Sequence, residues 1–385
     1  MTRVLLAVVV FFTASRAHAE PWIAQFEGYR CSKCHVNGTG GGMRTDFGRQ
    51  WAWTHLSLVS VASPSPASEP DGASQSSRPE PTGRAFSLIN PVINDAIAIG
   101  ANVRVDNTTT FAEDEVQNSF GNPEANFYVA LDALRYLTAY VDTSVAEGNV
   151  EAREAFVMLH RLKGFRLKGG VILLPYGLRI WGEEQFIRRE TGFTYSNPDL
   201  GVEFGYEWKG LGAFFAVSNG SGGGIDSDPD KRFTGTVEWA DRWWRLGLSS
   251  SFNSSDTQEE FLVGAHAGLT LGRLALLGQT DVIRSNFLEA DEVIEEFVAY
   301  AEANFLVVRG LNLKAAFGYH DPTLPVFSAD AVDVGEDQRF NILAGVEVFI
   351  VPMLATRLYY EVRESVPQDE VGNADILAVE LHVYL

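Results

Sequence analysis

The chain has 385 residues, 46% of them hydrophobic, and its 50 acidic and 30 basic side chains give a formal net charge of −20. Such a charge repels a polyanion, so nucleic-acid binding is excluded as a function. No stretch is long and apolar enough for a transmembrane helix, which needs about 20 residues without interruption by charges.

Residues 1–19, MTRVLLAVVVFFTASRAHA, have the pattern of a secretory signal peptide. Arg3 supplies the basic start, an apolar run follows from Val4 to Phe12, and Ala17-His18-Ala19 is a small-x-small cleavage site. The sequence therefore predicts that the protein is exported.

The segment GYRCSKCHVNGTGGGMR contains Cys31 and Cys34, the two cysteines of the chain, followed directly by His35. A disulfide over this spacing would close a very small loop and stabilise little. A structural zinc site would need a fourth ligand. Cys-x-x-Cys-His is the attachment sequence of haem c, so we predict one covalent haem, with Cys31 and Cys34 as thioether anchors and His35 as the proximal iron ligand.

The distal iron ligand has two candidates near the motif, Met43 and His55. Met43 lies eight positions after His35, and an extended chain at about 3.3 Å per residue would just span a haem edge over this distance. A distal position that is open or supplied by the rest of the chain is a third alternative. Alternation along the strands predicts that His266, His320 and His382 point inward as polar side chains.

Residues 20–60 form the predicted haem segment, and about forty residues rarely bury enough surface to fold unaided. Residues 61–84 are rich in Ser, Pro and Ala, which is typical of a flexible linker. Its random-coil span is about 25–30 Å. The haem segment is therefore expected either to lie in the periplasm beside the next domain or to enter it.

From residue 85 to 385 the pattern changes to many short runs with period two. In LATRLYYEVRE, for example, Leu358 and Tyr360 share one face while Arg357 and Glu361 share the other. We count about sixteen such runs, near 92–105, 124–134, 137–146, 151–162, 165–174, 199–208, 211–219, 233–241, 243–252, 260–271, 273–283, 293–307, 311–320, 339–350, 354–363 and 374–385.

The runs are joined alternately by tight turns, such as Lys209-Gly210, and by long polar loops, including 176–198. This alternation is typical of outer-membrane barrels. A soluble sandwich or propeller is the alternative, but nearly every run has a charged face, as the lining of a water-filled barrel has. Aromatic residues near the ends of runs are expected at the membrane interfaces: Trp208, Trp239, Trp243, Trp244, Tyr359 and Tyr384.

We therefore predict an all-β fold, a transmembrane outer-membrane β-barrel of about 16 antiparallel strands over residues 85–385, with a small N-terminal monohaem cytochrome c segment. The stretch PWIAQFEGYRCSKCHVNGTGGGMRTDFGRQW, followed by such a barrel, resembles the outer-membrane monohaem c-type cytochrome-porin fusions of iron-oxidising bacteria. The likeness lies in Pro21-Trp22, Ala24, Gly28, the CSKCH motif and Phe47-Gly48-Arg49. The chain departs from that family at Gly40-Gly41-Gly42, where the fusions carry a proline-containing stretch.

The resemblance implies electron transfer across the outer membrane between an extracellular donor or acceptor such as iron and periplasmic cytochromes. The direction implied is electron uptake, as by an Fe(II):cytochrome c oxidoreductase. Two alternatives remain: a diffusion porin whose haem segment is a plug or redox sensor, and electron export to extracellular metal. Outer-membrane lipid is the other expected partner.

Overall fold

The computed structural model describes residues 20–59, 92–94, 96–112, 115–134, 136–146, 149–180, 182–222, 229–365 and 373–384. The predicted signal peptide, residues 1–19, and the predicted linker, residues 61–84, lie outside the described residues. Within the described ranges, no helix has both the length and the apolar character to cross a membrane.

Four short helices and one long series of strands make up the described chain. The helical elements are α1 (Pro21–Glu27), α2 (Cys31–Cys34), α3 (Asp46–Trp51) with the π-helix η1 (Ala52–Leu56), and α4 (Phe186–Arg189). The strands are β1 (Val92–Asn94), β2 (Ile97–Ala112), β3 (Glu115–Leu134), β4 (Leu137–Ala146), β5 (Asn149–Leu162), β6 (Phe165–Ile172), β7 (Asp199–Trp208), β8 (Leu211–Ser218), β9 (Arg232–Ala240), β10 (Trp244–Ser254), β11 (Gln258–Leu271), β12 (Leu274–Phe287), β13 (Glu292–Val308), β14 (Leu311–Asp321), β15 (Arg339–Val351), β16 (Leu354–Ser365) and β17 (Ala374–Tyr384).

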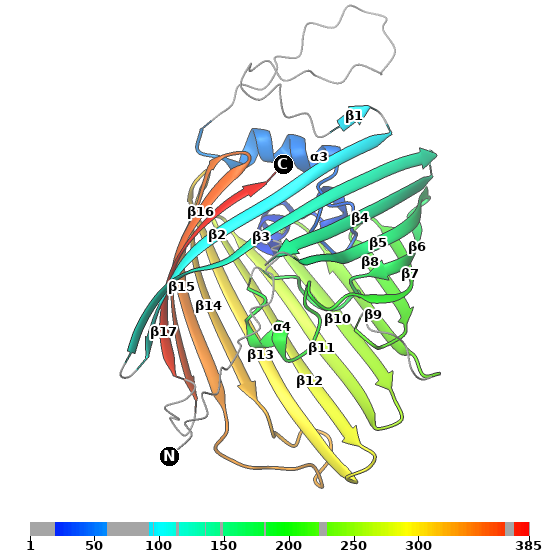
Figure 1. Cartoon of the computed structure of the whole chain (residues 1–385), viewed down its shortest axis with the longest axis vertical. Coiled ribbons are helices and arrows are strands. Elements are labelled where there is room, and N and C mark those ends of the chain that lie inside the picture. The colour runs from blue at the N-terminus through cyan, green and yellow to red at the C-terminus, as the bar shows by residue number, and fades with distance from the viewer. Residues whose placement is uncertain are drawn as a thin grey trace, which may run out of the picture.

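Strands β2 to β17 form a closed antiparallel barrel of sixteen strands (Figure 1). Each strand pairs with its neighbours in sequence, and β17 pairs with β2 to close the ring. The short β1 adds a hairpin partner to β2. The predicted all-β barrel and its sixteen strands are confirmed, and each predicted run corresponds to one strand of the ring.

The two faces of each strand differ as the alternation predicts. On β16, Leu358 and Tyr360 are 48% and 42% exposed on the outer surface, whereas Arg357 and Glu361 are 4% and 3% exposed inside. An apolar outer surface on a ring without free edges suits hydrocarbon, where every backbone group must be paired. In a sandwich this face would pack against a second sheet. The predicted location in the outer membrane is confirmed.

Two details differ from the sequence prediction. Strand β2 extends to Ala112 and β3 begins at Glu115, whereas the predicted runs end at 105 and begin at 124. The prediction stopped short because the added stretch is rich in polar residues and lacks the apolar alternation used to mark strands. Tyr359 and Tyr384 are 5% and 8% exposed and lie inside. Trp208, Trp239, Trp243 and Trp244 do lie on the outside, near turns of the same end.

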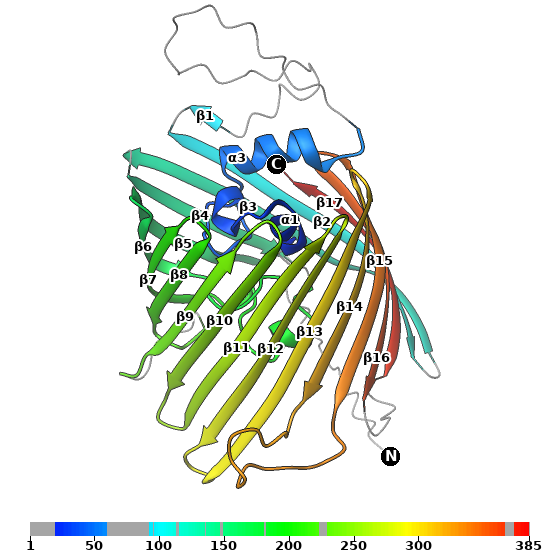
Figure 2. The same cartoon turned by 180° about the vertical axis from the view of Figure 1, so that it is seen from behind.

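The two ends of the barrel carry different connections. The end at which the chain terminates has short turns, such as 209–210, 272–273 and 352–353, which is the periplasmic end in outer-membrane barrels. The connection between β6 and β7, residues 173–198, contains the predicted long polar loop 176–198 but folds into the barrel, and its helix α4 contacts β12, β13 and β14 (Figures 1 and 2). We call residues 173–198 the inner loop.

Phe204 provides a test of the membrane face, because it is 59% exposed and pairs across strands with Leu167 and Phe215, which are also exposed. Replacing Phe204 with Arg is expected to destabilise the barrel by about 2–4 kcal/mol if it lies near the bilayer midplane. The free energy of unfolding in lipid vesicles measures the effect. Trp208→Arg, on the same face at the end of β7, is the control and should cost only about 0–1 kcal/mol; equal costs would contradict this placement.

Candidate functional site

Residues 20–59 fill the periplasmic end of the barrel: those before α3 lie inside and bond to inward side chains from all around the ring, whereas α3 and η1 lie across the mouth (Figures 1 and 2). We call residues 20–59 the lumenal segment. Figure 2 shows its helix α1 behind strands β9 to β12. The side-chain partners come from eight strands: Tyr140 (β4), Glu154 (β5), Lys168 (β6), Glu207 (β7), Arg245 (β10), Thr270 (β11), Lys314 (β14) and Arg357 (β16). The expectation that residues 20–60 lie in the periplasm or in the lumen is therefore decided in favour of the lumen.

Helix α1 is fixed against β11 at the start of the segment. Pro21 opens the helix, where its missing N–H costs nothing, and Gly28 ends it in the left-handed conformation. Gln25 and Thr270 exchange two hydrogen bonds of 3.0 and 3.1 Å. A side chain at Gly28 would collide with the backbone of Arg242, so glycine permits the closest approach of the segment to the turn between β9 and β10.

Cys31 and Cys34 lie one turn apart on α2, and His35 follows in extended conformation. The backbone N–H of His35 donates to the carbonyl of Cys31 at 2.9 Å, which sets the imidazole directly after the turn. His35 and Arg44 then form an antiparallel bridge, and Thr45 caps α3 by accepting from the N–H of Gly48. Both thiols are free. The sequence motif is therefore one compact unit in the lumen.

Gly41 and Gly42 have positive φ values of 81° and 65° and pass close to two tyrosines. A side chain at Gly41 would overlap Tyr195, and one at Gly42 would overlap the hydroxyl of Tyr140. These glycines therefore let the backbone of the lumenal segment pack on the barrel wall and on the inner loop.

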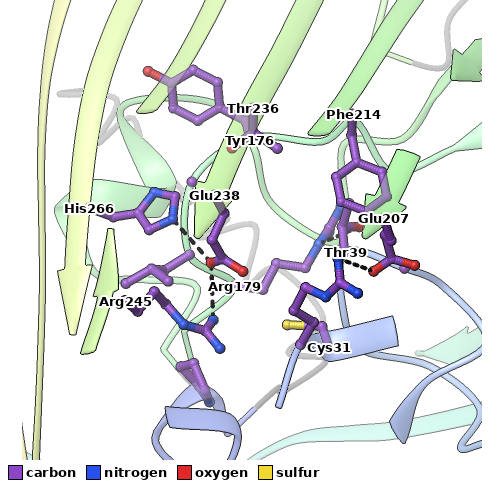
Figure 3. A pocket seen from close by; sticks show the side chains of 15 residues that line it. Cys31, Thr39, Tyr176, Arg179, Glu207, Phe214, Thr236, Glu238, Arg245 and His266 are labelled. Atoms are coloured by element: carbon purple, nitrogen blue, oxygen red, sulfur yellow. Dashed lines mark hydrogen bonds and ion pairs between the residues drawn. The ribbon is translucent and has the colours of Figure 1, made fainter. Parts of the chain in front are cut away.

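A cavity lies beside Cys31, between the lumenal segment, the inner loop and the barrel wall (Figure 3). Glu238 lies between His266 and Arg245, at 3.2 Å from each. From the inner loop, Arg179 donates to Thr39 of the lumenal segment at 3.1 Å. Further lining residues are Arg30, Tyr176, Glu207 and Phe214.

The residues at this site fit a haem c. Burial raises the pKa of the Cys31 thiol and raises that of Cys34 to about 11. Burial, followed by the charge of Arg44, lowers the pKa of His35 to about 4, so its imidazole is neutral, the form that ligates iron. Nδ1 of His35 is buried without a hydrogen bond of normal geometry to any described residue. Three arginines line the cavity, Arg30, Arg179 and Arg245, and their charge suits haem propionates.

The two candidate distal ligands lie elsewhere. Met43 is 6% exposed and directly precedes Arg44, the bridge partner of His35. Because side chains alternate along extended chain, the Met43 side chain points to the opposite face of the bridge from His35. His55 is exposed on η1, where it stacks on Trp51 with ring centroids 5.6 Å apart. Neither is brought against His35 by a described contact.

The inward histidines are placed as predicted: His266, His320 and His382 are 4%, 3% and 7% exposed. Of these, His266 lines the cavity beside Cys31. Arg179, Arg245 and Glu238 are neighbours of the motif that the sequence did not predict. Alternation marks Arg245 and Glu238 as inward, but no local pattern joins them to Cys31, more than 200 residues away.

The barrel is similar to solved outer-membrane proteins. The fold is that of the porins. Outer-membrane expressed OmpT of Vibrio cholerae superposes with a TM-score of 0.58 at 12% identity, over 77% of this chain and 100% of that one. An anion-selective porin from Comamonas acidovorans gives 0.55 at 11% over 75% and 99%, and Salmonella typhi OmpF in complex with daunomycin gives 0.57 at 11% over 75% and 97%. No protein family and no curated protein matches the sequence.

The substitution Asn37→Ala tests the hydrogen bonds that hold the lumenal segment in the barrel. Nδ2 of Asn37 donates to both carboxylate oxygens of the buried Glu154 at 2.8 Å, and Glu154 also accepts from the backbone of Leu173 in the inner loop. Asn37→Ala should lower the local opening free energy of the lumenal segment by about 1–3 kcal/mol, because a buried acceptor loses its donor. Hydrogen exchange of residues 29–44 measures it. Arg49→Ala, at an exposed ion pair with Asp46, should leave exchange there unchanged.

Proposed function

We propose that this protein carries one haem c in the barrel lumen and passes electrons across the outer membrane. The observation that supports this most strongly is the position of the Cys31, Cys34 and His35 unit inside a closed sixteen-stranded barrel. A hydrocarbon layer about 30 Å thick blocks electrons as it blocks ions. A redox group within the barrel therefore shortens the distance over which an electron must transfer between the two sides of the membrane.

Each residue has a defined task in this proposal. Cys31 and Cys34 hold the haem as thioethers, and His35 binds its iron on the proximal side. The haem supplies one-electron oxidation and reduction. Arg30, Arg179 and Arg245 offer cations for its propionates, and the inner loop restricts access of water from the outer side. The distal position stays a prediction, with Met43, His55, a barrel side chain or an open position as the alternatives.

Electron uptake from ferrous iron with delivery to periplasmic cytochromes is the direction that we propose. The test uses vesicles that contain the protein and enclose an oxidised soluble cytochrome c, with Fe(II) added outside under anaerobic conditions. Reduction inside should depend on the haem and be lost in Cys31→Ala/Cys34→Ala. Equal rates for both proteins would refute transmembrane transfer. A reduction potential well below that of the iron couple would instead favour export of electrons.

A diffusion porin is the second candidate function. It is supported by the fold, since the similar structures include a porin described as anion-selective. The lumenal segment would then be a plug or a redox sensor. Ion conductance of the intact protein in planar bilayers distinguishes this function, because a plugged electron conduit should conduct few ions.

A further inference from the structure

Three side chains in the outer part of the lumen form a group with the composition of a metal site. His320 lies on β14, Glu296 on the neighbouring β13, and Glu190 directly after α4 on the inner loop. One ligand atom from each lies within 4.8 Å of the others, the one group of three His, Cys, Asp or Glu residues this close in the described chain. Glu296 and His320 are near the ends of β13 and β14 that face away from the short turns, on the extracellular side.

The imidazole of His320 is held with one nitrogen unused. Its Nε2 lies 2.8 Å from Oε2 of Glu296 and donates to that carboxylate. In the neutral imidazole that donates from Nε2, Nδ1 keeps a free electron pair, which is the form that binds a metal ion. The side chain is 3% exposed, and Nδ1 has no hydrogen-bond partner among the described residues. A buried, oriented and unpartnered imidazole nitrogen is costly unless it binds something.

Nδ1 of His320 points toward Glu190, with 3.8 Å between it and Oε1 of that carboxylate. This distance is too long for a hydrogen bond. Two ligands that each lie about 2.1 Å from one ion are at most about 4.2 Å apart, so an ion fits between them. Glu296 completes the arrangement as the carboxylate that orients the ligating histidine, a common feature of metal sites.

We propose that Nδ1 of His320 and the carboxylate of Glu190 bind a divalent first-row transition-metal ion, with Glu296 orienting the imidazole. One imidazole and one carboxylate suit iron, manganese or zinc rather than calcium. The side chains of Glu190 and Glu296 are 21% and 25% exposed, so the ion reaches the site from the outer water. With water in its remaining positions, the ion binds weakly and exchanges readily.

This site gives the proposed electron conduit a docking position for its donor, and that part of the inference rests on the proposed function. The inner loop carries Glu190 on the outer side and, through Arg179, contacts the lumenal segment. Ferrous iron at His320 would thus lie on an element that also borders the cavity of Cys31. Metal binding itself does not depend on a haem.

Arg189 is the natural competitor of the ion. It donates to Oε1 of Glu190 through Nε at 2.8 Å, and its side chain is 48% exposed. An exposed pair of this kind contributes little and can be displaced. Arg189→Gln should therefore raise the metal affinity severalfold.

The test titrates the intact haem-loaded protein in detergent with Mn(II), a probe that does not react with the haem, and follows free Mn(II) by electron paramagnetic resonance. Wild type should bind one ion. Glu190→Gln and His320→Gln should each weaken binding at least tenfold, and Glu296→Gln should weaken it less. Glu184→Gln is the matched control, since it removes the same charge from the same loop at a carboxylate paired with Arg363. The site would be overturned if Glu184→Gln weakened Mn(II) binding as much as Glu190→Gln does, or if the wild-type protein bound no ion.

Ferrous iron then separates this inference from the proposed function. Under anaerobic conditions, Glu190→Gln should raise the Fe(II) concentration for half-maximal haem reduction at least tenfold while leaving reduction by ascorbate unchanged. Mn(II) binding without any haem reduction by Fe(II) would leave the metal site in place and contradict the conduit. An unchanged half-maximal Fe(II) concentration would contradict the docking role.

Discussion

The double variant Cys31→Ala/Cys34→Ala is expected to contain no covalently bound haem, whereas the wild-type protein should keep one haem per chain through denaturing electrophoresis and acid-acetone extraction. Thioether bonds need both thiols, and Cys31 and Cys34 are the only cysteines in the chain. Haem staining and the absorption spectrum of the purified protein measure the loss. The effect should be complete, because no other residue can form these bonds.

Ser32→Ala is the matched control, since Ser32 lies on the same helical turn and donates to Glu207 on the barrel wall. Its haem content should equal that of wild type. Two outcomes would contradict the assignment. Metal analysis could find zinc in place of haem in the wild-type protein, or a haem-stained band could survive in the double variant.

The barrel could be predicted from sequence because the alternation that specifies each strand can be seen within that strand alone. A strand between lipid and water must alternate, and runs such as Leu358 to Arg363 show that alternation without reference to any other part of the chain. The prediction fails where the surroundings change. The β2–β3 hairpin continues through polar residues. Tyr384 was expected in an aromatic girdle because it lies at a strand end, but alternation puts it on the inward face of Glu380 and His382, where Arg44 lies over its ring at 4.1 Å.

The inner loop shows a different limit. Its length and its position between β6 and β7 suggested a solvated external loop, yet Leu174, Ile180 and Ile187 are at most 5% exposed. Large apolar residues such as Leu178, Ile180 and Phe186, set among the polar ones of so long a connection, were the available signal that it packs inside. The metal-site residues Glu190, Glu296 and His320 are similarly dispersed over 130 positions, so only the folding of this loop into the barrel brings them together.

Deleting residues 20–84 is expected to open an ion channel through the barrel. Barrels of sixteen strands leave an aqueous lumen, and in this protein the lumenal segment occupies the periplasmic end through bonds to side chains of eight strands. The barrel should survive the deletion, since its sixteen strands pair with each other in a closed ring. Single-channel conductance in planar bilayers should therefore rise severalfold above that of the full-length protein.

The deletion should also leave basic side chains facing the open channel. Without Glu20, Lys314 and Arg357 lose ion pairs of 3.2 and 2.6 Å, although Glu347 still pairs with both. The inner loop stays in place, because Tyr176 and Leu178 bond to Asp281 and Gln279 on β12. The channel should consequently be narrower than an empty barrel. Equal conductance of the two proteins would mean that ions already pass the lumenal segment, and the intact protein would then be a diffusion porin with a tethered haem.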